Sequence, residues 1–145
     1  MGAKYFEELK IGEKIVLPPV LITSRARTIH VDIYGEDWPI ETLKDATDRQ
    51  IIPSPMIISI IAGQMGKIQF FRMKFVKNYS VQLLAPIFVG DTITTNCVVK
   101  ELRPHKDPSK NYGYVFIEQQ VLNQNKKICY IRTLCYLVTK KLFSN

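Results

Sequence analysis

The second half of the chain contains four strand-like stretches with no helical segment between them. They cover residues 79–86, 91–103, 111–123 and 126–141, and short polar turns separate them. In the second stretch Ile93, Cys97 and Val99 alternate with more polar neighbours, which is the period of a strand with one buried face. Parallel strands would need long crossover connections, so these stretches predict an antiparallel meander.

An apolar segment at residues 53–71 precedes these strands and has the composition of a buried helix. Ser54 is predicted as its N-cap and Pro55 as its first helical residue, where a missing N–H does no harm. Apolar side chains then fall on nearly every face, which is typical of a helix buried on most sides. Glycine weakens an exposed helix by about 1 kcal/mol, so we expect Gly63 and Gly66 to permit close approach of a surrounding sheet.

The first half of the chain is less regular. Pro18 and Pro19 interrupt a β-branched run and predict an edge, a bulge or a crossing loop. The alternation over residues 20–25 predicts a further strand, and residues 40–50 form a short helical candidate. Together these patterns predict an α+β fold in which a curved antiparallel sheet wraps a long central helix, as in the hotdog fold.

The size of the chain fits a single domain over residues 1–145. Of its 145 residues, 46% are hydrophobic, which is sufficient for one core. No uninterrupted apolar run reaches the roughly 18 residues that a membrane-spanning helix needs, and the opening "KYFEELK" does not resemble a secretory signal. We therefore expect a cytoplasmic protein without a membrane partner.

The net charge of +7 comes from dispersed basic residues, as in "NKK" and "TKK". Because no aromatic residues are interleaved with them, solvated surface is favoured over a nucleic-acid site, which stays a minor alternative. The same charge would attract a polyphosphate ligand such as coenzyme A. The three cysteines lack metal-ligand spacing, and Cys129 and Cys135 are expected to share one strand face as small hydrophobic residues. No disulfide, metal or cofactor is predicted.

Three stretches resemble the MaoC-like branch of hotdog proteins, which comprises (R)-specific enoyl-CoA hydratases and acyl-thioester dehydratases. The opening "KYFEELKIGEKI" is similar to that family's Y-F-E-D-L-x-x-G entry. The segment "LLAPIFVGDTITTNCVVKELRP" is similar to its P-V-x-x-G-D turn and following long strand. The stretch "YGEDWPIE" lies where the family has G-D-x-N-P-x-H. The resemblance implies an acyl-thioester ligand and reversible addition and elimination of water.

The family's catalytic residues are not retained at the matching positions. Its Asp falls on Glu36, its Asn on Trp38 and its His on Glu41. Its H-G-M at the helix start falls on Ser54, Pro55 and Met56, so the Gly whose N–H polarises the thioester carbonyl becomes a Pro without one. Loss of one such donor typically lowers a rate by a factor of about 100 to 1,000.

Glu36 and Glu41 are the best acid/base candidates, because carboxylates crowded beside an aromatic side chain can separate into an acid and a base. We expect Trp38, Ser54, Met56 and Ser59 to contact the substrate, although Ser59 also fits a hydrogen bond back to its own helix. Asp37 is a candidate helix cap, and His30 a candidate source of the missing imidazole.

Three functions remain open from the sequence. The first is hydration or dehydration of acyl thioesters, and the second is a non-catalytic hotdog subunit beside an active paralogue. The third is acyl-CoA thioesterase activity, since other hotdog enzymes use a carboxylate as base or nucleophile. Exposed sheet edges favour a homodimer, a higher homo-oligomer or a hetero-oligomer.

Overall fold

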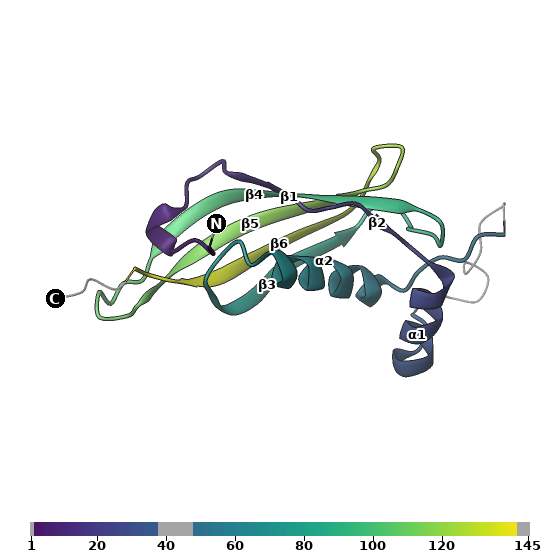
Figure 1. The fold of residues 1–145 in the computed structure, drawn as a ribbon, viewed down its shortest axis with the longest axis horizontal. Coiled ribbons are helices and arrows are strands. Elements are labelled where there is room, and N and C mark those ends of the chain that lie inside the picture. The colour runs from purple at the N-terminus through teal and green to yellow at the C-terminus, as the bar shows by residue number, and fades with distance from the viewer. Residues whose placement is uncertain (1, 38–47, 142–145) are drawn as a thin grey trace.

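The computed structural model describes residues 2–37 and 48–141 of the chain. It begins with a 3-10 turn, η1, and two short strands, β1 and β2, and continues through helices α1 and α2 to four long strands (Figure 1). The bounds are η1 Phe6–Glu8, β1 Lys14–Val16, β2 Val20–Leu21, α1 Ser24–Tyr34, α2 Ser54–Ile68, β3 Met73–Leu83, β4 Thr92–Pro104, β5 Tyr112–Leu122 and β6 Ile128–Thr139.

The four long strands and β1 form one twisted sheet in the order β1-β4-β5-β6-β3, and β2 pairs separately with β4. Every pairing between these strands is antiparallel, as predicted, and β4, β5 and β6 follow one another as a meander. The meander predicted for all four stretches is wrong for the first, because β3 pairs with β6 and not with β4. The first long strand begins at Met73, earlier than the sequence pattern indicated. Its outer edge has no strand beside it among the described residues. β3 therefore presents a long open edge.

Helix α2 lies against one face of this sheet (Figure 1) and supplies Met56, Ile57, Ile61 and Met65 to the hydrophobic core. Alternate residues of β4, β5 and β6 face the helix, because neighbouring side chains on a strand point to opposite faces. The predicted arrangement of a central helix and a curved antiparallel sheet is confirmed.

Two details of the helix prediction are wrong. The helix starts at Ser54, with Pro53 as its N-cap, so Ser54 does not cap it. The face that carries Ser59, Gly63 and Gly66 is exposed, and a Cβ atom on either glycine would meet nothing within 4 Å among the described residues. The reason is that the sheet covers only one side of α2 within this chain.

The strand predicted over residues 20–25 is also wrong beyond Leu21. Helix α1 begins at Ser24, because the Thr23 hydroxyl accepts a hydrogen bond from the Ala26 N–H at 3.1 Å and caps the first turn. The helix buries Arg27 and exposes Ile33 and Tyr34. The short helix predicted for residues 40–50 lies mostly outside the described residues.

The three cysteines are free and buried. Cys129 belongs to the hydrophobic core, whereas Cys135 alternates with Leu134 and Tyr136, which are both part of that core. Cys135 therefore points to the other face, and the prediction of a shared face is wrong because the strand pairing is irregular next to Leu122. No helix within the described ranges combines the length and hydropathy that crossing a bilayer would require.

Candidate functional site

A pocket of about 360 Å³ lies between the end of α1 and the start of α2. Its walls include a histidine, a tyrosine, two carboxylates, a proline and a serine. These are His30, Tyr34, Glu36, Asp37, Pro55 and Ser59. We call it the junction pocket. It gathers polar side chains beside the N-terminus of the long helix, where backbone N–H groups and the helix dipole favour negative charge.

The chain turns into this pocket at Gly35. The Gly35 N–H donates to the Val31 carbonyl at 2.9 Å and ends α1. Its φ of 86° lies in the left-handed region that glycine adopts without steric cost. The next two residues, Glu36 and Asp37, are thereby directed back toward α2, and each carboxylate has a separate partner.

Arg27 holds Glu36 in place. Its side chain is only 7% exposed, and its Nε donates to the Ile51 carbonyl at 2.8 Å. Its Nη2 donates to Glu36 Oε2. One guanidinium thus links α1, the segment before α2 and the loop after α1, as a planar group with several fixed donors is suited to do.

Asp37 binds the start of α2. The Ser54 N–H lies 3.3 Å from each carboxylate oxygen of Asp37, and the Ser54 hydroxyl donates to Oδ2. Asp37 therefore binds the first amide of α2, whereas its predicted role as a cap of the helix at residues 40–50 lies outside the described residues. Pro55 has no N–H, and the Met56 N–H donates to the Pro53 carbonyl at 3.0 Å. The amides at the start of the helix are thus occupied or absent.

His30 of α1 and Ser59 of α2 line the pocket from two different helices. The His30 ring packs beside the Tyr34 ring, with centroids 5.2 Å apart and planes tilted by 52°. The Ser59 hydroxyl donates to the Pro55 carbonyl at 3.2 Å, so the predicted bond back to its own helix is confirmed. His30 therefore brings to the pocket an imidazole ring, whose two nitrogens can donate and accept a hydrogen bond.

The predicted site residues divide into three groups. Glu36, Ser54 and Ser59 lie at the junction pocket or at the helix start beside it. Met56 is 4% exposed and packs in the core, so it has no contact with this pocket. Trp38 and Glu41 lie outside the described residues. Sequence reasoning did not identify Arg27, because its partners are distant in sequence and no local pattern signals them.

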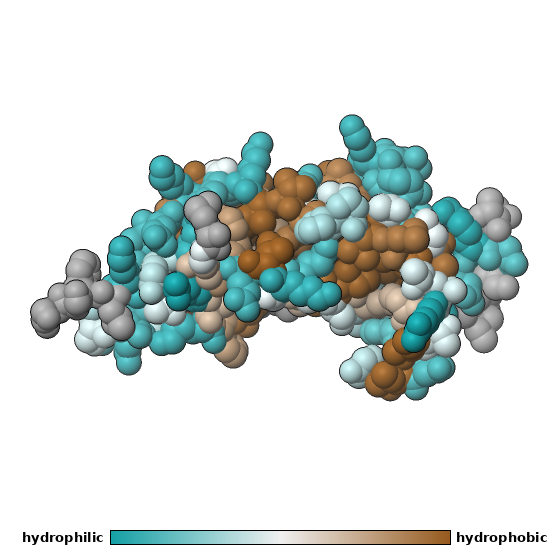
Figure 2. Space-filling view, in the orientation of Figure 1, coloured by the Kyte–Doolittle hydropathy of each residue, from teal (hydrophilic) through white to brown (hydrophobic). Residues whose placement is uncertain are grey.

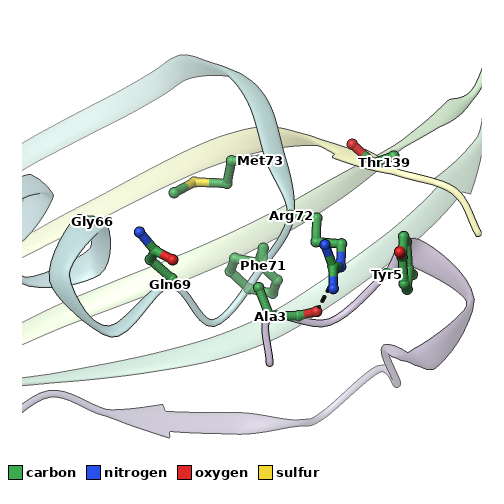
Figure 3. Close-up of a pocket in the computed structure, with 8 residues that line it drawn as sticks. All are labelled: Ala3, Tyr5, Gly66, Gln69, Phe71, Arg72, Met73 and Thr139. Carbon is green, nitrogen blue, oxygen red and sulfur yellow. Dashed lines mark hydrogen bonds between the residues drawn. The ribbon is translucent and has the colours of Figure 1, made fainter. Parts of the chain in front are cut away.

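A larger pocket, of about 500 Å³, lies at the opposite end of α2 (Figure 3). In this pocket the Arg72 guanidinium donates to the Ala3 carbonyl at 3.0 Å and lies 4.2 Å from the centre of the Tyr5 ring. These contacts fix the N-terminal segment against the sheet. The pocket's lining has no carboxylate or imidazole, so it lacks the proton carriers of the junction pocket. Among the described residues, no three His, Cys, Asp or Glu side chains are grouped to hold a metal ion.

Comparison with known proteins gives matches in structure alone. Neither a family model nor a curated protein sequence matches the chain. The double-hotdog protein RV0216 from Mycobacterium tuberculosis is 18% identical, with a TM-score of 0.83 over 99% of this chain and 46% of that protein. The chain therefore spans less than half of that relative.

Two further structures align over most of both chains. A MaoC-like dehydratase from Rhodospirillum rubrum is 13% identical, with a TM-score of 0.77 over 97% of this chain and 100% of its own. The (R)-hydratase PhaJ1 from Pseudomonas aeruginosa is 16% identical, with a TM-score of 0.71 over 97% and 92%. At such identities the likeness establishes architecture, and the chain has the hotdog fold seen in MaoC-like dehydratases and (R)-hydratases.

Proposed function

We propose that the chain binds acyl thioesters at the junction pocket and catalyses the reversible addition of water to an enoyl thioester. The observation that carries this proposal is the grouping of His30, Glu36 and Asp37 in one pocket beside the N-terminus of α2. Hydratases and dehydratases with the same fold support the reaction class.

The chemistry requires one proton carrier and one site for developing negative charge. His30 removes a proton from water as the resulting hydroxide bonds to the β carbon. The electron pair of the double bond moves toward the thioester oxygen, and the proton is then delivered to the α carbon. Glu36, fixed by Arg27, orients the water, and the α2 N-terminus stabilises the enolate once Asp37 has moved away from Ser54.

One observation favours the alternative of a non-catalytic subunit. Asp37 occupies the Ser54 N–H, and Pro55 contributes none, so the helix start presents no free amide in its first two positions. A subunit with this arrangement would bind the thioester weakly or only support an active paralogue. Binding and turnover must therefore be measured separately.

The test measures binding of crotonyl-CoA by calorimetry and its hydration by loss of the enoyl absorbance. We expect binding and turnover by the wild-type protein. We expect His30→Asn to lower kcat by about 100-fold or more, as removal of a general acid/base does. The matched control is His105→Asn, which changes the other histidine. His105 lies in the loop after β4, away from the junction pocket, and its variant should retain full activity.

Other outcomes separate the alternatives. Binding without turnover supports the non-catalytic subunit, and release of free thiol supports a thioesterase. Absence of binding overturns the proposed ligand class. Turnover that is unchanged in both His30→Asn and Glu36→Gln would show that the junction pocket is not the reaction centre.

We also propose that the functional unit is a homodimer formed along β3. The strand has an open edge, and Phe75 and Leu84 on or beside it are each at least 56% exposed. Figure 2 shows apolar residues gathered across the middle of the face that carries α2. Sedimentation analysis should give a dimer for the wild type and a monomer for Phe75→Lys. Val16→Lys, a change at another exposed apolar residue on β1, serves as the control and should leave the dimer intact.

A further inference from the structure

The face of the sheet that packs against α2 is apolar except for one group of polar side chains. Gln119 on β5 lies directly opposite Arg132 on β6 and Cys97 on β4, so the three share one face. In the neighbouring row across the sheet, Val121 on β5 pairs with Thr95 on β4 and with Tyr130 on β6. We call Thr95, Gln119, Tyr130 and Arg132 the polar row. None of the four is more than 4% exposed.

Several atoms of the polar row lack hydrogen-bond partners. Within the described part of the chain, Thr95 Oγ1 and Tyr130 Oη have none, and the Gln119 amide has only loose contacts with Cys97 and Tyr136 in place of a well-formed hydrogen bond. More than nine in ten buried polar groups in folded proteins have a partner. Apolar side chains of the same shape would leave this core at least as stable, because an unpaired buried polar group opposes folding. The row is therefore better explained by a ligand than by stability.

The chemistry of the row favours an anion. A guanidinium carries only N–H donors, and the hydroxyl groups and the Gln119 amide add further donors around it. Burial raises the pKa of Cys97 to about 11 and that of Tyr136 to about 12, so these neighbours stay neutral at physiological pH. Arg132 thus supplies the positive charge beside them. A carboxylate matches this set, because it accepts several charge-assisted hydrogen bonds.

The row also reaches an open margin of the fold. Arg132 pairs with Val81 on β3, and Tyr130 pairs with Leu83, so these four residues face the same side of the sheet. Val81 is 45% exposed, so this side of the sheet is open to solvent at β3. A chain that reaches the row from this side would meet Val81 before Arg132. This margin adjoins the helix whose N-terminus forms the junction pocket.

We propose that the polar row binds a carboxylate at the distal end of the acyl group, so that the substrates are thioesters of dicarboxylic acids. This inference rests on the proposed function, because it assumes that an acyl thioester binds at the junction pocket. It adds the substrate class and names Arg132, Gln119 and Tyr130 as specificity-determining residues.

The experiment compares glutaryl-CoA with pentanoyl-CoA, which have acyl chains of equal length with and without a terminal carboxylate. Calorimetric titration of the wild-type protein should give glutaryl-CoA at least about tenfold tighter binding, as a charge-assisted pair in a buried site provides. Arg132→Met should abolish this preference. Lys106→Met removes the same charge from the exposed loop after β4 and should leave the preference unchanged.

Two substitutions of uncharged side chains keep the proposal testable if the arginine variant does not fold. Gln119→Leu and Tyr130→Phe remove buried polar atoms while retaining volume. Both should keep or raise the melting temperature and both should reduce the preference for glutaryl-CoA. A fall in melting temperature with an unchanged preference would assign these groups a purely structural role and overturn the proposal.

The remaining outcomes distinguish the two proposals. Equal binding of both thioesters overturns the carboxylate site and leaves the proposed function standing. A preference that disappears equally in Lys106→Met and Arg132→Met reflects overall charge and also overturns the site. Absence of binding by either thioester overturns both proposals.

Discussion

The junction of α1 with α2 and the inner face of the sheet each bury an arginine, but the two regions differ in how many of their other polar groups have hydrogen-bond partners. At the junction, Arg27 donates to the Ile51 carbonyl and Glu36, and Asp37 accepts from Ser54. In the sheet, Thr95 Oγ1 and Tyr130 Oη have no such partner among the described residues. Polar groups at the junction hold segments together, whereas the hydroxyl groups of Thr95 and Tyr130 in the sheet are buried without a partner among the described residues.

The largest effect expected comes from the apolar contact between α2 and the sheet. Ile61 is fully buried in that contact, so Ile61→Ala should lower the free energy of unfolding by about 2–5 kcal/mol. Ile33→Ala on α1, where the side chain is 64% exposed, should change it by less than about 0.5 kcal/mol. Urea titration measures both. Equal effects would show that α2 is not anchored through Ile61.

The second prediction concerns the paired polar groups of the junction. Arg27→Met leaves the Ile51 carbonyl and Glu36 without their donor, so we expect a loss of about 1–3 kcal/mol in stability. Arg25→Met changes an exposed residue of the same helix and should be nearly neutral. Denaturant unfolding checks the pair. If Arg27→Met is as stable as the control, the junction does not depend on this guanidinium.

The third prediction uses the neutral groups beside the polar row. Burial raises the pKa of Cys97 from 9.0 to about 11 and that of Tyr136 from 10.0 to about 12, so the folded state retains protons that the unfolded state releases. This stabilisation is complete below pH 9, and it decreases as pH rises toward 12. Each retained proton contributes a slope of about 1.4 kcal/mol per pH unit.

Unfolding measured at increasing alkaline pH tests this slope. Tyr136→Phe removes one titrating group, so its stability should fall less steeply above pH 10 than that of the wild type. Tyr112→Phe, on a partly exposed residue of β5, provides the control. Parallel curves for Tyr136→Phe and the wild type would contradict the assignment.

The smallest effect is expected at the cap of α1. Thr23→Ala removes the hydroxyl that accepts from the Ala26 N–H and should reduce stability by about 1 kcal/mol. Thr28→Ala, at an exposed position inside the same helix, should be neutral or slightly stabilising. Thermal unfolding compares the two. An equal or larger loss in Thr28→Ala would mean that the Thr23 hydroxyl contributes little.

The sheet could be predicted because its signal is local. Alternating burial along a strand follows from the alternation of apolar and polar residues next to one another in the sequence. The stretch predicted at 91–103 differs from β4 by one residue at each end. Helix α1 was missed because residues 20–25 also alternate, and the cap at Thr23 decided the outcome. The approach of Arg27 to Ile51 depends on the completed fold, so no short pattern could indicate it.

The candidate site was predicted only in part for the same reason. The segment around Glu36 stood out through its crowded carboxylates, and the structure places Glu36 and Asp37 in one pocket. His30 lines the junction pocket because helix α1 carries it there, and α1 was not predicted from the sequence. The exposure of Gly63 on α2 depends on how much of the helix the sheet covers.

The Asp37 carboxylate accepts the Ser54 N–H, so a group of the protein itself occupies the helix start where a ligand would bind. A group on the same chain has an effective concentration set by the linkage, up to the order of millimolar for short flexible linkers, so a ligand carbonyl group would compete with Asp37 for the Ser54 N–H. Affinity measured for the whole protein would then understate the intrinsic affinity of the helix start. Shortening or neutralising that internal competitor, as in Asp37→Gly, offers a direct route to a tighter-binding variant.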